Sequence, residues 1–264
     1  NSYVMAFMRY LAGTLLLLPL IVRLGTHRTF HSYRKSLHVA RGVIHACGMF
    51  LWFAALPLIS LAELTALGFT GPIFVTIGAA LFLGEDVRLR RWAAVLVGFG
   101  GAMIIIRPGF AEIGWGAVCV LISTPIFSAS NLISKSLART DSAETIVAWQ
   151  HCVIVVCAAP VAFWFWQTPT APQLLLFLAA GVFGSLGYFF ITWAFRLLDI
   201  SALQPITFLG IVWAALMDVA VWGKTSDIWT FVGAAVIFGS AMYISHREAV
   251  RRAQIKSAAS QPAP

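Results

Sequence analysis

The chain has 264 residues, of which 60% are hydrophobic and only 11% are charged, with a formal net charge of +8 and a mean hydropathy of +0.87. A soluble domain carries roughly a quarter charged residues, so this composition excludes an ordinary soluble protein and indicates a membrane protein. The basic residues occupy short gaps between apolar runs instead of forming one continuous patch. This placement argues against a nucleic-acid partner.

A membrane-spanning helix needs about 20 mostly apolar residues, and we predict an all-α integral membrane protein with nine such spans. In chain order they are Val4–Val22, Val39–Leu58, Ala62–Leu83, Trp92–Ile106, Gly114–Ile133, Ile146–Trp166, Leu174–Phe195, Ala202–Trp222 and Trp229–Ser245. Residues 248–264, rich in Ala, Ser, Gln and Pro, are predicted to form a disordered tail. The four cysteines lie inside apolar runs without C-x-x-C spacing, so we expect neither a metal site nor a cofactor.

The basic residues predict the orientation of the spans in the membrane. Of the 18 Lys and Arg residues, all except Arg9, Arg107 and Lys224 fall on one side of the predicted topology. The side with more basic residues is normally cytoplasmic. The C-terminus, and with it the tail from residue 248, is therefore predicted to lie in the cytoplasm.

Part of the sequence occurs twice. A shift of 139 residues places Gly42–Pro108 on Gly181–Arg247 without a gap, and it aligns several glycines together with two runs. These runs are Phe99-Gly100-Gly101-Ala102-Met103 and Phe238-Gly239-Ser240-Ala241-Met242. We therefore predict two repeats, residues 1–109 and residues 110–247, the first with four spans and the second with five. Duplicated membrane units of this kind build many transporters.

The repeat also predicts a further helix. The partner of Gly114–Ile133 would precede residue 1, so we expect the reading frame to extend upstream and to encode another apolar helix. A unit that crosses the membrane an odd number of times places its second copy in the opposite orientation. Inverted repeats place a binding site at their interface near the midplane of the bilayer.

Several short motifs resemble the drug/metabolite transporter superfamily, specifically its EamA-type members with ten helices. The motifs are Phe7-Met8-Arg9-Tyr10-Leu11-Ala12, Ala62-Glu63-Leu64-Thr65-Ala66-Leu67, Phe69-Thr70-Gly71-Pro72-Ile73-Phe74, Leu83-Gly84-Glu85, Ala202-Leu203-Gln204-Pro205 and Val212-Trp213-Ala214-Ala215. The resemblance covers residues 5–247 and implies a secondary transporter of the bacterial inner membrane that moves a small metabolite. The chain departs from the family in lacking the first helix and in having Lys224 where an acidic residue is usual.

Polar residues inside spans are costly and therefore indicate function or internal bonding. Asp218 lies inside the eighth predicted span, and we interpret it as a site or coupling residue or as a carboxylate near the interface. Gln204, Phe208, Ile211 and Ala215 share one helix face with it. We predict that this face lines a substrate cavity, although the same spacing also describes ordinary packing.

The opposing wall of the predicted cavity comes from other spans. His45 and Trp52 share a face of the second span, where His45 is either a hydrogen-bonded structural histidine or a group that titrates near neutral pH. Asn131, with Ser123 and Ser130 nearby, bonds either to substrate or to another helix. Phe69 and Trp213 complete the set of predicted cavity residues.

Three further ionisable residues are assigned gating or structural roles. Arg9 occupies the position of an arginine in the family motif, and otherwise would extend to the outer interface. Glu63 and Glu85 bracket the third span. Because Glu85 is close in sequence to Arg88, Arg90 and Arg91, its simplest interpretation is an ion pair at the interface.

Three classes of function are compatible with a membrane protein of this size. An alternating-access transporter of a small molecule fits the repeats and the family resemblance. A membrane-embedded enzyme needs a nucleophile, an acid/base pair or metal ligands in register, and the sequence has no H-E-x-x-H, no G-x-S-x-G and no carboxylate pair. A channel or structural protein stays an alternative, and a homodimer is left open.

Overall fold

The computed structural model describes residues 2–59, 64, 67–106, 114–210, 212–213 and 228–259. These residues belong to two compact units. The first unit comprises residues Asn1–Leu64 and Glu112–Leu198, and the second comprises Thr65–Ala111 and Asp199–Pro264. Each unit therefore draws helices from both predicted repeats, and the repeat boundaries at residues 109 and 110 are not boundaries of compact structure.

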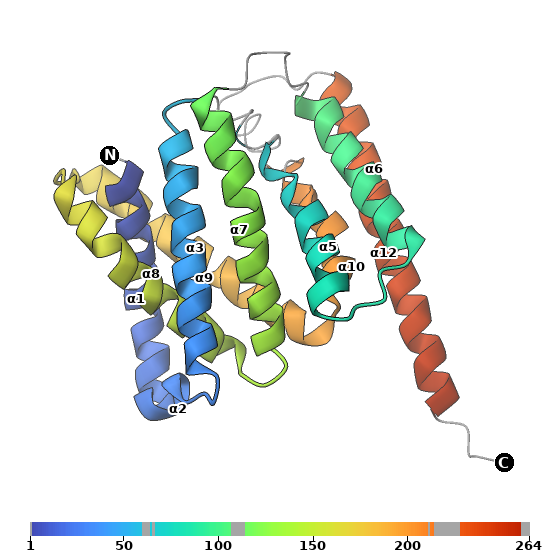
Figure 1. Cartoon of the computed structure of the whole chain (residues 1–264), viewed down its shortest axis with the longest axis horizontal. Coiled ribbons are helices and arrows are strands. Elements are labelled where there is room, and N and C mark those ends of the chain that lie inside the picture. The colour runs from blue at the N-terminus through green and yellow to red at the C-terminus, as the bar shows by residue number, and fades with distance from the viewer. Residues whose placement is uncertain are drawn as a thin grey trace. The chain divides into compact units, whose positions relative to one another are not determined.

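The first unit is built from long apolar helices. Its elements are α1 (Ser2–Leu24), the short α2 (Thr26–Phe30), α3 (Lys35–Ala55), α7 (Trp115–Leu137), α8 (Ala143–Trp164) and α9 (Ala171–Leu197) (Figure 1). Helix α3 packs along α7 and α8, and α1 packs against α8 and α9. All of these except α2 are long and apolar enough to cross a membrane.

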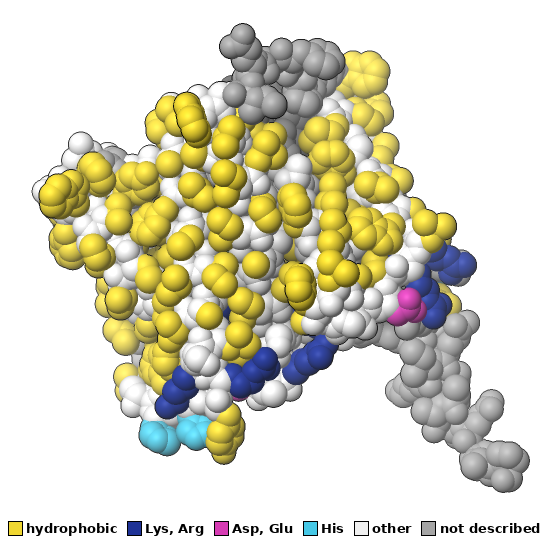
Figure 2. All heavy atoms as spheres, viewed as in Figure 1, with side chains coloured by type: hydrophobic (Ala, Val, Ile, Leu, Met, Phe, Trp, Pro, Cys, Tyr) yellow, Lys and Arg dark blue, Asp and Glu magenta, His cyan; other side chains and the backbone are white. Residues whose placement is uncertain are grey.

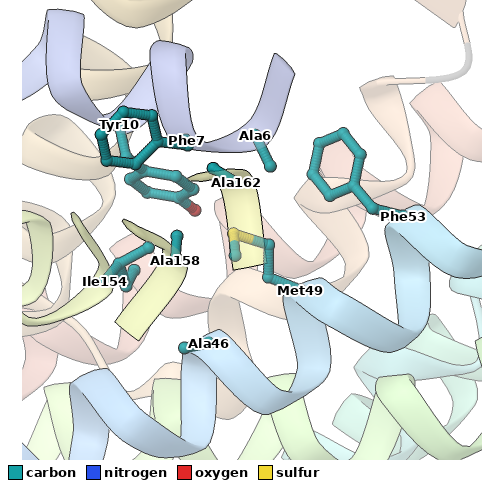
Figure 3. Close-up of a cluster of buried hydrophobic side chains, with 9 residues drawn as sticks. All are labelled: Ala6, Phe7, Tyr10, Ala46, Met49, Phe53, Ile154, Ala158 and Ala162. Carbon is teal, nitrogen blue, oxygen red and sulfur yellow. The ribbon is translucent and has the colours of Figure 1, made fainter. Parts of the chain in front are cut away.

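The core of the first unit is a cluster of apolar side chains from three helices. Figure 3 shows Phe7 of α1, Met49 and Phe53 of α3, and Ile154 of α8 directed toward one another. Small residues let these helices approach closely. A Cβ atom on Gly42 would lie 2.5 Å from side-chain atoms of Val153, so α3 and α8 make backbone-to-side-chain contact there.

The second unit contains α5 (Gly71–Phe82), α6 (Leu89–Ile106), α10 (Ile200–Thr207) and α12 (Ile228–Ala259). Helix α6 lies along α12, and α10 packs against α5 (Figure 1). The core of this unit consists of Ala102, Phe208, Val212 and Ile237. Its described apolar helical segments include Gly71–Phe82 and Phe231–Ser240, which are shorter than a bilayer-spanning helix.

Two predicted spans contain a turn in the structure. In the third span, predicted from Ala62, the described helix α5 begins at Gly71, after a turn in which the Thr70 hydroxyl donates to the Leu67 carbonyl. Pro72 stands in the first turn of α5, where its missing N–H has no helical acceptor to lose. In the eighth span, α10 ends at Thr207, two residues after Pro205. The count of nine spans and the inverted repeats stay predictions.

The tail was predicted as disordered from residue 248, and this is wrong as far as Ala259. Helix α12 continues through these residues. The physical reason is composition: the segment contains Ala, Arg, Glu, Gln and Lys, which all have high helix propensity. Because α12 is already nucleated upstream, each added residue extends the helix without a new nucleation cost.

Charged and apolar side chains separate along the helices. In Figure 2, Lys and Arg side chains of the first unit gather at the end where α3 begins and α7 ends. There, Arg34 donates to the backbone carbonyl and the hydroxyl of Ser136, at 3.0 and 2.9 Å. Large apolar side chains such as Val156 and Phe183 are exposed along the helix sides. A contiguous apolar surface of this kind is suited to contact with lipid.

Candidate functional site

The most polar buried region of the first unit surrounds His45. This side chain is 3% exposed, and both of its ring nitrogens have hydrogen-bond partners. Nε2 lies 3.1 Å from the hydroxyl of Tyr10 on α1 and 3.1 Å from the hydroxyl of Tyr188 on α9. Nδ1 lies 3.3 Å from the hydroxyl of Ser130 on α7. Four helices therefore meet at one imidazole ring.

The partners of Ser130 fix the tautomer of His45. The Ser130 hydroxyl donates its proton to the backbone carbonyl of Arg41, at 3.4 Å. The serine oxygen can then only accept from His45, so Nδ1 carries a proton and Nε2 presents a lone pair. The lone pair faces the hydroxyls of Tyr10 and Tyr188. At least one tyrosine can therefore donate to Nε2, in a chain of hydrogen bonds that ends at the α3 backbone.

Aromatic rings surround this hydrogen-bonded centre. The His45 ring lies 4.9 Å from Phe127 and 5.5 Å from Tyr188, measured between centroids. The ring of His151 on α8 lies 5.4 Å from Tyr10. Its Nδ1 bonds to the Val147 carbonyl and its Nε2 to the Ser185 hydroxyl, each at 3.0 Å. These five rings (Tyr10, His45, Phe127, His151 and Tyr188) are called the aromatic cluster below.

Two guanidinium groups adjoin the aromatic cluster. Arg41 is 2% exposed, and it donates to the Ile146 carbonyl at 3.1 Å and to Gln150 Oε1 at 2.6 Å. Arg9 lies over the ring of Tyr10, 5.3 Å from its centroid, and turns inward against α9. A Cβ atom on Gly184 would lie 2.8 Å from an Arg9 nitrogen, so glycine at that position leaves room for the guanidinium. Arg9 therefore does not extend along the outside of the helix.

Carboxylates are scarce around these two cations. In the described part of the first unit, the only acidic residues are Asp141 and Glu144, at the connection between α7 and α8. Asp141 is already bonded, accepting from the Ser32 hydroxyl at 2.8 Å and pairing with His38 Nε2 at 2.7 Å. Among the described residues, the charged groups that adjoin the aromatic cluster are therefore the two guanidinium groups of Arg9 and Arg41.

The structure places the predicted site residues in different surroundings. His45, predicted to line a substrate cavity, is at the centre of this buried polar region, and its role in substrate binding stays a prediction. Trp52, predicted on the same helix face, contacts the ring of Phe53 at 5.1 Å and lies at the edge of the apolar core. Asn131 is half-buried on α7. Arg41 lies within the predicted span Val39–Leu58, but it was not among the predicted site residues. Helix α3 begins at Lys35, which places Arg41 inside the helix.

The other predicted cavity residues belong to the second unit. Phe208 is fully buried in its apolar core, 5.3 Å from the ring of Phe69, and both are packing positions there. Gln204 Nε2 donates to the Ile200 carbonyl of its own helix at 2.8 Å. The side chain of Trp213 is 60% exposed. Asp218, Ile211, Ala215 and Glu63 lie outside the described residues, so their predicted roles stay predictions.

Glu85 holds the beginning of α10. Its carboxylate accepts from the backbone N–H groups of Ile200 and Ser201, at 2.9 and 3.1 Å, and from the Ser201 hydroxyl at 2.5 Å. These are the amides that a helix leaves unpaired at its N-terminus, where a negative charge also opposes the positive end of the helix dipole. Arg91 lies 3.9 Å from the carboxylate and bridges it to Asp199. The predicted ion pair is present, and its carboxylate also caps a helix.

Long apolar helices around a buried, bonded polar centre define a multi-pass membrane protein. The chain belongs to the EamA-like transporter family, whose model matches residues 1–107 and 114–246. It is 35% identical to a riboflavin transporter of Rhizobium johnstonii over 246 residues, 92% of this chain and 80% of the relative. It is 28% identical to an S-adenosylmethionine uptake transporter of Rickettsia bellii over 248 residues, which are 94% of this chain and 85% of that relative.

A solved protein structure has the same fold at 19% sequence identity. The TM-score is 0.77, and the match covers 95% of this chain and 88% of the other. The family match and the named relatives support the prediction of a small-metabolite transporter made from sequence.

Proposed function

We propose that this transporter carries a metabolite built on a fused nitrogen heterocycle, by alternating access across the bacterial inner membrane. The relatives named for riboflavin and for S-adenosylmethionine support this substrate class. Both molecules join a planar fused ring to a hydroxyl-bearing chain or sugar. The ring is their shared chemistry, so the site should first of all recognise a flat aromatic group.

The observation that carries the proposal is the aromatic cluster. Its rings meet at centroid distances of 4.9 to 5.5 Å for three contacting pairs. Rings of this kind stack on a planar ligand or meet it edge to face. Stacking of a base on an aromatic side chain contributes about 1–3 kcal/mol. Two tyrosine hydroxyls at the same place add hydrogen bonds that a purely apolar pocket lacks.

The proposed cycle uses the two inverted repeats. Substrate binds near the midplane, and rocking of helices exposes the site to one side and then to the other. In this orientation the C-terminus is cytoplasmic, as the distribution of basic residues predicts. A gradient or exchange drives the cycle, and no catalytic step is included. The transporter acts as a monomer or a homodimer.

The test is transport by the purified chain in proteoliposomes. Labelled riboflavin and labelled S-adenosylmethionine are each supplied outside, with excess unlabelled compound inside, so that counterflow reports saturable exchange. We expect counterflow of at least one of the two, and we expect Tyr188→Leu to reduce it more than Tyr33→Leu does. Tyr33 is an exposed tyrosine of the first unit and serves as the control. Absence of saturable counterflow for both compounds would refute the substrate class.

A further inference from the structure

Next to the aromatic cluster, two buried side chains have hydrogen-bond donors without acceptors. Among the described residues, the Nε–H of Arg41 and the Nε2 amide of Gln150 have no hydrogen-bond partner. The two side chains are bonded to each other, because Arg41 donates to Gln150 Oε1 at 2.6 Å. Arg41 is 2% exposed and Gln150 is 0% exposed. Buried donors of this kind destabilise the protein when they are left unpaired.

The cost is larger because one of the two groups is charged. A cation inside a membrane protein is normally paired with a carboxylate or lines a polar cavity. Arg41 has no carboxylate partner in the described part of the first unit, where Asp141 is engaged by Ser32 and His38. Its acceptors are one backbone carbonyl and one amide oxygen. Arg41 and Gln150 together therefore have more hydrogen-bond donors than acceptors around them, and they carry a net positive charge.

Arg41 and Gln150 adjoin the residues of the proposed ring site. The backbone carbonyl of Arg41 accepts from the Ser130 hydroxyl at 3.4 Å, and the same hydroxyl lies 3.3 Å from His45 Nδ1. Gln150 directly precedes His151 on α8. A ligand whose ring contacts the aromatic cluster would therefore have Arg41 close to one of its edges.

We propose that Arg41 and Gln150 form a subsite for an oxygen-bearing acceptor group of the substrate, which rests on the proposed function above. A group with two acceptor oxygens would satisfy Arg41 Nε–H and the Gln150 amide together. Two sources supply this chemistry: the α-carboxylate of an amino-acid moiety, or the two ring carbonyls of a flavin. A carboxylate would also neutralise the guanidinium.

The experiment measures ligand affinity by thermal unfolding of the full chain purified in detergent. Riboflavin carries ring carbonyls, S-adenosylmethionine carries a carboxylate, and adenosine carries neither. We expect Arg41→Gln to bind riboflavin, S-adenosylmethionine or both about 10- to 100-fold more weakly, the value of a lost hydrogen bond to a charged group. Adenosine affinity should not change. A lower affinity for riboflavin alone would identify the ring carbonyls as the group bound by the subsite. A lower affinity for S-adenosylmethionine alone would identify the carboxylate.

Two further variants separate this role from a structural one. Gln150→Glu is nearly isosteric and supplies Arg41 with an internal carboxylate, so it should keep the protein folded while weakening the same ligands. Arg34→Gln, at the cytoplasmic end of α3, removes a charge away from the cluster and should leave all affinities unchanged. If every one of these two compounds that binds wild type binds Arg41→Gln equally well, the subsite is wrong and the proposed function stands. If neither compound binds wild type, the substrate class and the subsite are both refuted.

Discussion

Replacing Glu85 by glutamine tests whether this residue is part of the framework or a moving gate. The side chain is 4% exposed, and its carboxylate accepts three hydrogen bonds from Ile200 and Ser201 at the start of α10. Glutamine has nearly the same shape, but its amide nitrogen would face one of these donors. The substitution therefore loses hydrogen bonds and removes a negative charge near Arg91, which keeps its ion pair with Asp199.

The expected magnitude follows from the burial of these groups. Breaking one side of a buried charge pair costs about 3–5 kcal/mol. On the scaling of soluble domains, about 2–4 °C per kcal/mol, the midpoint of thermal unfolding should fall by about 6–20 °C. The assay is intrinsic tryptophan fluorescence of the purified protein during heating in detergent. Asp86→Asn is the matched control, because Asp86 pairs with Arg88 at 2.8 Å with both side chains 65% exposed. Such a surface pair contributes about 0–1 kcal/mol.

The result that would refute this reasoning is an unchanged unfolding midpoint in Glu85→Gln. A normal midpoint combined with altered transport would assign Glu85 to gating instead. A lower midpoint with normal transport at low temperature would assign it to the framework.

Three other predictions concern orientation, coupling and packing. In a cysteine-free background, a cysteine at Ser32 should resist an impermeant maleimide in intact cells while one at Thr170 reacts; the opposite pattern would invert the topology. Asp218→Asn should abolish substrate binding or the pH dependence of flux, and wild-type flux at every pH would make Asp218 an interfacial carboxylate. Gly42→Ala should destabilise the protein by about 1–3 kcal/mol because the new methyl group overlaps a valine of α8. Gly187→Ala, where nothing lies within 4 Å of the added atom, is its control, and equal midpoints for the two variants would contradict the close contact.

The sequence predicted the long helices well because each is a single apolar run bounded by polar residues. The predicted span Leu174–Phe195 lies within the observed helix Ala171–Leu197, and Val4–Val22 lies within Ser2–Leu24. Hydropathy identified the apolar part and missed the polar first and last turns. Hydropathy also could not show that the chain folds into two compact units, because helix packing depends on contacts between distant segments and not on local composition.

The site was predicted only where a polar residue interrupts an apolar run. His45 is such a residue, and it was recognised for that reason. Tyr10 and Tyr188 are common in membrane helices, and nothing in their spacing shows that both hydroxyls reach one imidazole nitrogen. Glu85 was interpreted as an ion-pair partner because arginines follow it in the sequence. Three of its hydrogen bonds come instead from Ile200 and Ser201, more than a hundred residues away.

The division of each unit between distant parts of the chain has a consequence for biogenesis. The acceptors of Arg41 on α8 lie 105 and 109 residues further along the chain, so they are synthesised well after α3. An arginine at the centre of a membrane helix costs about 2.5–3.5 kcal/mol to insert, so a nascent α3 should stay near the translocon or the interface until its partners arrive. Neither half of a chain cut between residues 111 and 112 contains a complete unit. Two such halves, synthesised separately, would have to assemble in the membrane before Arg41 or His45 is buried with its partners.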